Sequence, residues 1–237
     1  MSYFEARIKV DFENFDEIKK TLNLCEKLRI KNLILEPRKN ILDINPQTKR
    51  NLQELTNIDL FYRFTLSGKT LKDLKTQMKL YKNKPEIISI ESPNQKIQEY
   101  AATDTRIDLL SFSDYHVLNT FSEGLLSLAV QNNKFIEFSL TPIMSNNRIY
   151  QSKAFRKLHR SIKLVINSHA KFIISGNFKN LYDLRNPRAL ISICHTLLGI
   201  PLEEAKKAFS KNVKLLLKKA EQRNNKLLFE DGVKLID

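Results

Sequence analysis

Short apolar runs alternate with segments of helical periodicity along nearly the whole chain, and this alternation constrains the fold more than any other feature. The runs expected to form strands are residues 4–10, 32–36, 59–66, 86–91, 107–112, 135–140 and 171–174. The helices expected after them are about residues 14–29, 46–55, 71–81, 92–102, 123–132, 148–167, 186–199, 201–209 and 212–223. Such alternation predicts right-handed βαβ units and a parallel sheet.

The units repeat without a linker or a low-complexity segment between them. No GxGxxG follows the first strand and no GxxxxGK[ST] occurs, so the sequence lacks the commonest nucleotide-binding signals of doubly wound sheets. We therefore predict an α/β fold, a single distorted or incomplete (β/α) TIM-like barrel over residues 1–237, with seven strands or an irregular eighth. The tail after about residue 224 is expected to be frayed.

The positive charge is unevenly distributed. The 237 residues carry a formal net charge of +14, but residues 1–144 hold 21 Lys and Arg against 19 Asp and Glu, whereas residues 145–237 hold 19 against 7. A basic surface concentrated in 145–237 favours a polyanion partner, RNA or DNA, over an ordinary solvated surface. No membrane partner is expected, because no apolar run reaches 18 residues and no basic helix carries exposed bulky aromatics.

The expected helix at 148–167 has a basic face. Its apolar stripe consists of Phe155, Leu158, Ile162, Val165 and Ile166. Steps of three and four residues place five cations on the opposite face: Lys153, Arg156, Lys157, Arg160 and Lys163. These charges repel one another in the free protein, and a phosphate backbone would relieve that repulsion and release counterions. The alternative is an ordinary exposed helix face.

Residues 169–199 form a complete strand, loop and helix unit. Asn186 is a good N-cap and Pro187 suits the first helical position. The loop before them carries Lys179 and Arg185, and Arg188 follows in the first turn. Loops after the carboxyl ends of parallel strands are usual ligand sites, so a phosphate site is expected here. The alternative is a structural Arg185 that pairs with Asp183.

Residues for catalysis are scarce. The histidines His116, His159, His169 and His195 form no HxH or HExxH pattern, and only His116 is expected near the barrel mouth. The strand-end acids Glu36, Glu91 and Asp114 are too dispersed to indicate a metal site. Cys25 and Cys194 fall on apolar helix faces, so we expect them to be reduced and buried, as in a cytoplasmic protein. No catalytic and no metal residue is predicted.

Several motifs resemble the archaeal ribonuclease P protein component 3 family, relatives of the thirty-kilodalton eukaryotic subunit. They are DLLSF at 108–112, Arg148 at the start of a long helix, IISGN at 173–177, DLRNPRAL at 183–190, LLGIPLEEA at 197–205 and SKN at 210–212. The resemblance implies a barrel like those of the polymerase-and-histidinol-phosphatase phosphoesterases. Their first strand carries a DxHxH-like motif, whereas this one reads RIKVDF.

The resemblance also implies a function. The chain would be a protein subunit of ribonuclease P that removes 5′ leaders from precursor tRNA. Catalysis would belong to the RNA and its bound Mg²⁺, with no cofactor in the protein itself. The partners would be ribonuclease P RNA, ribonuclease P protein component 2, other ribonuclease P proteins and precursor tRNA.

We expect ten residues to bind RNA: Arg148, Lys153, Arg156, Lys157, Arg160, Lys179, Arg185, Arg188, Lys214 and Lys218. The last two belong to the closing helix, which is also rich in lysine. Two other functions stay open at this point. One is a stand-alone metal-dependent phosphoesterase built on the barrel, and the other is a basic interaction module that does not bind RNA.

Overall fold

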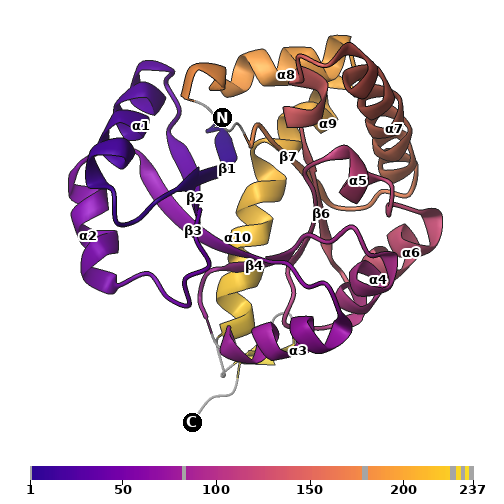
Figure 1. Cartoon of the computed structure of the whole chain (residues 1–237), viewed down its shortest axis with the longest axis horizontal. Coiled ribbons are helices and arrows are strands. Elements are labelled where there is room, and N and C mark those ends of the chain that lie inside the picture. Colours follow the sequence, from indigo (N-terminus) through magenta and orange to yellow (C-terminus); the bar gives the residue numbers. More distant parts are fainter. Residues whose placement is uncertain (1, 82–83, 178–180, 225–227, 231–232, 235–237) are drawn as a thin grey trace.

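The computed structural model of the chain describes residues 2–81, 84–177, 181–224, 228–230 and 233–234. Seven strands follow one another in chain order across one sheet, and each pairs in parallel with the next. They are β1 (Phe4–Val10), β2 (Asn32–Pro37), β3 (Asp59–Leu66), β4 (Ile87–Ile90), β5 (Leu109–Phe112), β6 (Phe135–Ser139) and β7 (Phe172–Ser175). The sheet curls into a nearly closed barrel (Figure 1), which confirms the TIM-like prediction.

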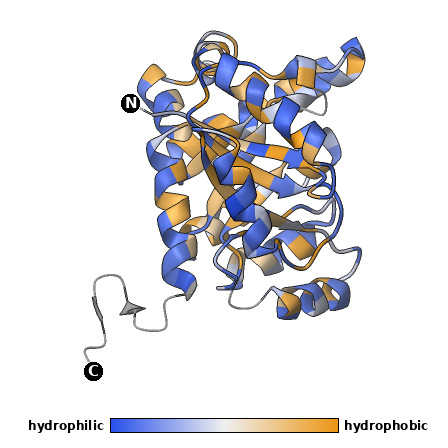
Figure 2. Cartoon of the chain, turned by 90° about the vertical axis from the view of Figure 1, so that its left-hand side faces the viewer, coloured by the Kyte–Doolittle hydropathy of each residue, from blue (hydrophilic) through white to orange (hydrophobic). Residues whose placement is uncertain are grey.

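Helices surround the strands in chain order and turn their apolar faces toward the sheet (Figures 1 and 2). They are α1 (Phe15–Lys27), α2 (Pro46–Glu54), α3 (Leu71–Leu80), α4 (Gln95–Thr103), α5 (Tyr115–Leu118), α6 (Glu123–Gln131), α7 (Arg148–Asn167), α8 (Pro187–Thr196), α9 (Leu202–Ala208) and α10 (Lys211–Asn224), with 3₁₀ turns η1 (Thr141–Met144) and η2 (Leu181–Asp183). Side chains cap many of these helices, as the oxygen of Asn147 does for α7 and that of Asn186 for α8. In the described residues no helix is both long and apolar enough to cross a membrane.

Two regions differ from the sequence-based expectation. Asp114 caps a short helix, α5, where a loop was expected, and its carboxylate accepts hydrogen bonds from the backbone of His116 and Val117. In the tail expected to be frayed, β8 (Leu228–Glu230) pairs antiparallel with β9 (Val233–Lys234). The other residues beyond Asn224 lie outside the described part of the chain.

The first and last strands of the barrel meet without a ladder of backbone hydrogen bonds in the described residues. Instead, the backbone N–H of Gly176, just after β7, donates to both carboxylate oxygens of Glu5 on β1, at 3.0 and 3.3 Å. The corner between α9 and α10 joins the same two strands at their amino ends. Phe4 N–H donates to the carbonyl of Phe209 at 2.8 Å, and Asn212 Nδ2 donates to that of Phe172 at 2.7 Å.

Helix α10 crosses the amino ends of the strands and closes that end of the barrel. Its apolar residues Val213, Leu216 and Ala220 pack against inward-facing residues of the strands: Phe4, Ala6, Ile34, Ile87, Leu109, Phe135 and Ile173. At the end of α10, Arg223 donates to Asp108 at 3.1 Å and to the carbonyl of Glu86 at 2.7 Å. The carboxyl ends of the strands are therefore the open end of the barrel.

Candidate nucleic-acid interface

Helix α7 buries one face and exposes its cations on the other. Ala154, Leu158, Ile162 and Val165 are buried, and the 20-residue helix contains no acidic residue. The exposed cations are Arg148, Lys153, Arg156, Arg160 and Lys163. Lys157 is less exposed than expected: it is half-buried and donates to the carbonyl of Phe121 at 3.2 Å, so it tethers the helix to the loop before α6, while its role in RNA binding stays a prediction.

The loop after β7 places Arg185 at the surface. Its Nη1 donates to the carbonyls of Tyr182 and Leu184, at 2.6 and 2.9 Å. Among the described residues Arg185 forms no ion pair with Asp183, so that structural alternative is not realised in this form. Arg188 is exposed in the first turn of α8. The start of this helix lies beside the end of α1, where Asn186 Nδ2 donates to the carbonyl of Leu28 at 2.6 Å. Lys179 lies outside the described residues.

Helix α10 exposes Lys214 and Lys218 on the side away from the barrel. Nearby, the ammonium groups of Lys171 and Lys219 lie 5.7 and 5.9 Å from the centre of the Phe135 ring. Burial, helped by the nearby charge of Lys219, lowers the pKa of Lys134 to about 8. Positive charge is thus also concentrated at the amino-terminal end of the barrel.

The predicted RNA-binding residues therefore lie on separate surfaces. Those of α7 line the outer ring of helices, Arg185 and Arg188 flank the start of α8, and Lys214 and Lys218 lie under the closed end of the barrel (Figure 1). A polyanion that contacts all of them would have to pass around the barrel. The sequence predicted the excess of positive charge in residues 145–237, but the tertiary structure determines which surfaces carry it.

The interior of the barrel holds a network of buried charges above the apolar layer formed with α10. Arg7 binds both oxygens of Glu36, at 2.8 and 3.1 Å, and its Nη1 lies 2.7 Å from Glu91. Arg63 binds both oxygens of Glu137, at 2.9 and 2.8 Å. Burial alone would raise the pKa of Glu36, but the charges of Arg7 and Arg63 outweigh it and lower that pKa to about 2.

Sequence reasoning missed this network. Glu36 and Glu91 were expected to have solvated or structural roles and were not paired with any partner, yet both carboxylates contact Arg7. The available signal was a charged residue inside an otherwise apolar strand, as in RIKV, FYRF and FIEF. A buried charge needs a partner, so these residues should have been paired with one another across the sheet.

A cavity of about 980 Å³ opens at the carboxyl ends of the strands. Its lining includes Lys9, Glu91, Asp114, Asn147 and Asp183, and the ion pair of Glu91 with Arg7 connects it to the buried network. His116, expected near this mouth, is exposed on α5 beside the Tyr115 ring and does not line the cavity.

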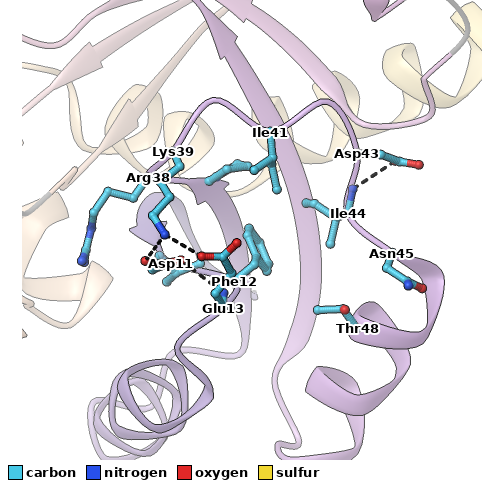
Figure 3. A pocket seen from close by; sticks show the side chains of 12 residues that line it. Asp11, Phe12, Glu13, Arg38, Lys39, Ile41, Asp43, Ile44, Asn45 and Thr48 are labelled. Atoms are coloured by element: carbon cyan, nitrogen blue, oxygen red, sulfur yellow. Dashed lines mark hydrogen bonds and ion pairs between the residues drawn. The ribbon is translucent and has the colours of Figure 1, made fainter.

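A smaller cavity, of about 220 Å³, lies between the loops after β1 and β2. Figure 3 shows Lys39 reaching between Asp11 and Glu13, with Nζ–O distances of 3.2 and 2.6 Å. Asp43 turns back to the backbone N–H of Ile44. Lys39 binds Asp11 and Glu13, and Arg38 binds Glu17, so both cations of this rim already have partners and the cavity offers little to an anion.

The two cysteines are not placed for nucleophilic catalysis. Cys25 and Cys194 are buried free thiols, and burial raises the pKa of each to about 12, so neither is a nucleophile at neutral pH. Within the described residues no group of three or more His, Cys, Asp or Glu side chains is placed to hold a metal ion.

Residues 2–225 match the family described as RNase P subunit p30. The chain belongs to this family. Membership over almost the whole chain identifies it as a ribonuclease P subunit, in agreement with the resemblance noted from its motifs.

Curated relatives carry the same description. Ribonuclease P protein component 3 of Methanothermobacter thermautotrophicus is 20% identical over 196 residues, covering 80% of this chain and 77% of that protein. The component 3 protein of Haloarcula marismortui is 21% identical over 66% of each chain. Protein GAMETOPHYTE DEFECTIVE 1 of Arabidopsis thaliana is 26% identical over 56% of this chain but 22% of that protein.

Solved structures share the fold. A chain in the cryo-EM structure of archaeal ribonuclease P with mature tRNA matches with a TM-score of 0.81, covering 99% of this chain and 98% of that one at 16% identity. The phosphotriesterase homology protein from Escherichia coli, crystallised with phosphate in its active site, matches with a TM-score of 0.53, covering 93% and 98% at 11% identity. The specific likeness to polymerase-and-histidinol-phosphatase barrels stays a prediction.

The barrel interior disfavours the stand-alone phosphoesterase. Two of its buried carboxylates, Glu36 and Glu137, already bind guanidinium groups through both oxygens. A divalent cation there would have to displace Arg7 or Arg63 and would be repelled by the other. These two carboxylates are therefore occupied by Arg7 and Arg63 and are not free to bind a metal ion.

Proposed function

We propose that this ribonuclease P subunit binds the catalytic RNA of the particle through the exposed cations of α7, with α10 as a second contact. The observation that carries the proposal is a helix with five exposed cations and no acid on a chain of this family. Neutralising phosphates releases counterions, so such a helix contributes affinity independently of sequence. Bound in this way, the protein supports the fold in which the RNA removes 5′ leaders from precursor tRNA.

The rest of the assignment follows from this role. The partners we propose are ribonuclease P RNA, protein component 2, other ribonuclease P proteins and precursor tRNA, assembled in the cytoplasm. Mg²⁺ would be held by the RNA, and hydrolysis would take place there. The archaeal relatives named component 3, and the guanidinium groups that bind Glu36 and Glu137 inside the barrel, support this division of roles.

Charge removal on α7 tests the proposal. The triple variant Arg156→Gln/Arg160→Gln/Lys163→Gln removes three exposed cations, and we expect the slope of log K against log salt for ribonuclease P RNA to become shallower by about 2. Reconstituted cleavage of precursor tRNA at low Mg²⁺ should fall in parallel. The matched control is Lys19→Gln/Lys20→Gln/Lys27→Gln, which removes three exposed cations from α1. If both variants lost the same RNA affinity, the loss would reflect the net charge of the protein and would count against α7 as the contact.

A further inference from the structure

The rim of the barrel mouth carries the two most exposed large apolar side chains among the described residues. Tyr182 on η2 is 92% exposed and Ile149 at the start of α7 is 71% exposed. Each is followed in the chain by a residue that lines the cavity, namely Asp183 and Tyr150. Single exposed apolar residues are ordinary, but two beside one large cavity mark a contact surface.

The cavity also differs in charge from the rest of this basic protein. Lys9 lies 3.4 Å from Glu36, Arg38 binds Glu17, and Arg7 binds Glu91, so these lining charges already have partners. Asp114 and Asp183 line the same cavity and form no ion pair with any residue that the structure describes. Among the described residues that line the cavity, the charge without an ion-pair partner is therefore negative, on a chain whose formal net charge is +14.

This charge selects the kind of occupant. A phosphate backbone would meet Asp114 and Asp183 at the mouth, whereas it meets only cations along the exposed face of α7. A lysine or arginine side chain would be attracted by the two carboxylates, and its aliphatic part could pack on the exposed rings and methyl groups of the rim. The cavity, at about 980 Å³, has ample room for such a side chain with its neighbours.

We propose that the barrel mouth is the docking site for another protein, which inserts a lysine or arginine side chain into the cavity lined by Asp114 and Asp183 and packs against Tyr182 and Ile149 at its edge. Aromatic and arginine side chains are enriched at the buried centre of protein interfaces, where they commonly supply most of the binding energy. The proposal is separate from RNA binding through α7, although both rest on the chain being part of a ribonucleoprotein particle. Arg148, exposed at the same rim, would favour RNA, so RNA is the rival occupant that the test must detect.

Site-specific photo-crosslinking in the reconstituted ribonuclease P particle distinguishes these occupants. Tyr182 is replaced by p-benzoylphenylalanine, which keeps an aromatic side chain at an exposed position. The control places the same group at Leu55, which is exposed after α2, near the amino end of β3. We expect position 182 to form an adduct with a protein component, at a peptide containing lysine or arginine. An adduct with RNA alone, or a protein adduct with a yield no higher than at position 55, would overturn the proposal.

The two aspartates supply the second readout. Asp114→Asn/Asp183→Asn removes both charges, and asparagine still caps α5, so the fold is retained. We expect the protein adduct at position 182 to fall at least fivefold, and Glu54→Gln/Glu123→Gln, which removes two exposed charges elsewhere, to leave it unchanged. If the yield of the protein adduct were the same with and without the two aspartates, the proposed cationic anchor would be refuted. RNA binding by the α7 variants is measured in a separate experiment, so a failure of the RNA-binding proposal can be distinguished from a failure of the docking proposal.

Discussion

The carboxylate of Glu5 accepts two hydrogen bonds from the backbone N–H of Gly176, and this contact joins the first strand of the barrel to the end of the last. The two residues are separated by 171 positions in the chain. In a complete eight-stranded barrel, backbone ladders close the sheet. Here, with seven strands, a buried side chain takes over part of that role.

Glu5 should make the stability of the protein depend on pH. Burial outweighs its hydrogen bonds and raises the pKa of Glu5 from 4.5 to about 7. Between those values the folded state holds a proton that the unfolded chain has lost, so stability decreases as pH rises from 4.5 to 7 and then levels off. Glu5→Gln, which stays neutral, should gain about 3 kcal/mol relative to the native chain across that window. Urea unfolding of both proteins from pH 4.5 to 8 measures the difference, and parallel curves would contradict the prediction.

Arg63 should be essential to the fold. Arg63→Met leaves Glu137, which is fully buried, without its bidentate partner, and the expected loss is about 3–5 kcal/mol of unfolding free energy. Arg106→Met, which breaks the partly exposed pair with Asp104, should cost no more than about 1 kcal/mol. Chemical unfolding at pH 7 compares the two. Similar losses would mean that the buried network contributes no more than a surface pair.

Asn212 should hold α10 against the amino ends of the strands. Asn212→Ala removes the hydrogen bond to the carbonyl of Phe172 and leaves that carbonyl without the side-chain donor, at an expected cost of about 1–2 kcal/mol. In hydrogen exchange, the amides of α10 should exchange faster in this variant than in the native chain. The amides of α4, which lies elsewhere in the ring of helices, should exchange at the same rate in both. Unchanged protection of α10 would mean that its apolar face alone holds it in place.

Arg185 tests the phosphate site expected before α8. One nitrogen, Nη1, serves the carbonyls of Tyr182 and Leu184, while the side chain is exposed. Arg185→Lys should leave the melting temperature nearly unchanged and weaken RNA binding by about 1–3 kcal/mol, because lysine cannot form the paired hydrogen bonds of a guanidinium. A lower melting temperature with normal RNA affinity would assign Arg185 to the loop structure alone.

Local pattern by itself determined the elements and their order. The apolar runs and the Asn186-Pro187 helix start predicted strands and helices within a few residues of their observed bounds. Spacing along the chain is enough for this, because a strand or helix face is defined by neighbours two to four residues apart. The same pattern predicted the exposed cations of α7, apart from Lys157.

The tertiary structure decided which distant residues meet. The register shift of β1 between Glu5 and Ile8, and the pairing of Arg63 with Glu137 across 74 positions, depend on how the sheet curls. The gap between β1 and β7 depends on it as well, and so does the position of Asp114 and Asp183 at the mouth, where neither forms an ion pair within the described part of the chain. No periodicity specifies these contacts, since each partner's position is set by the packing of all the strands and helices between them.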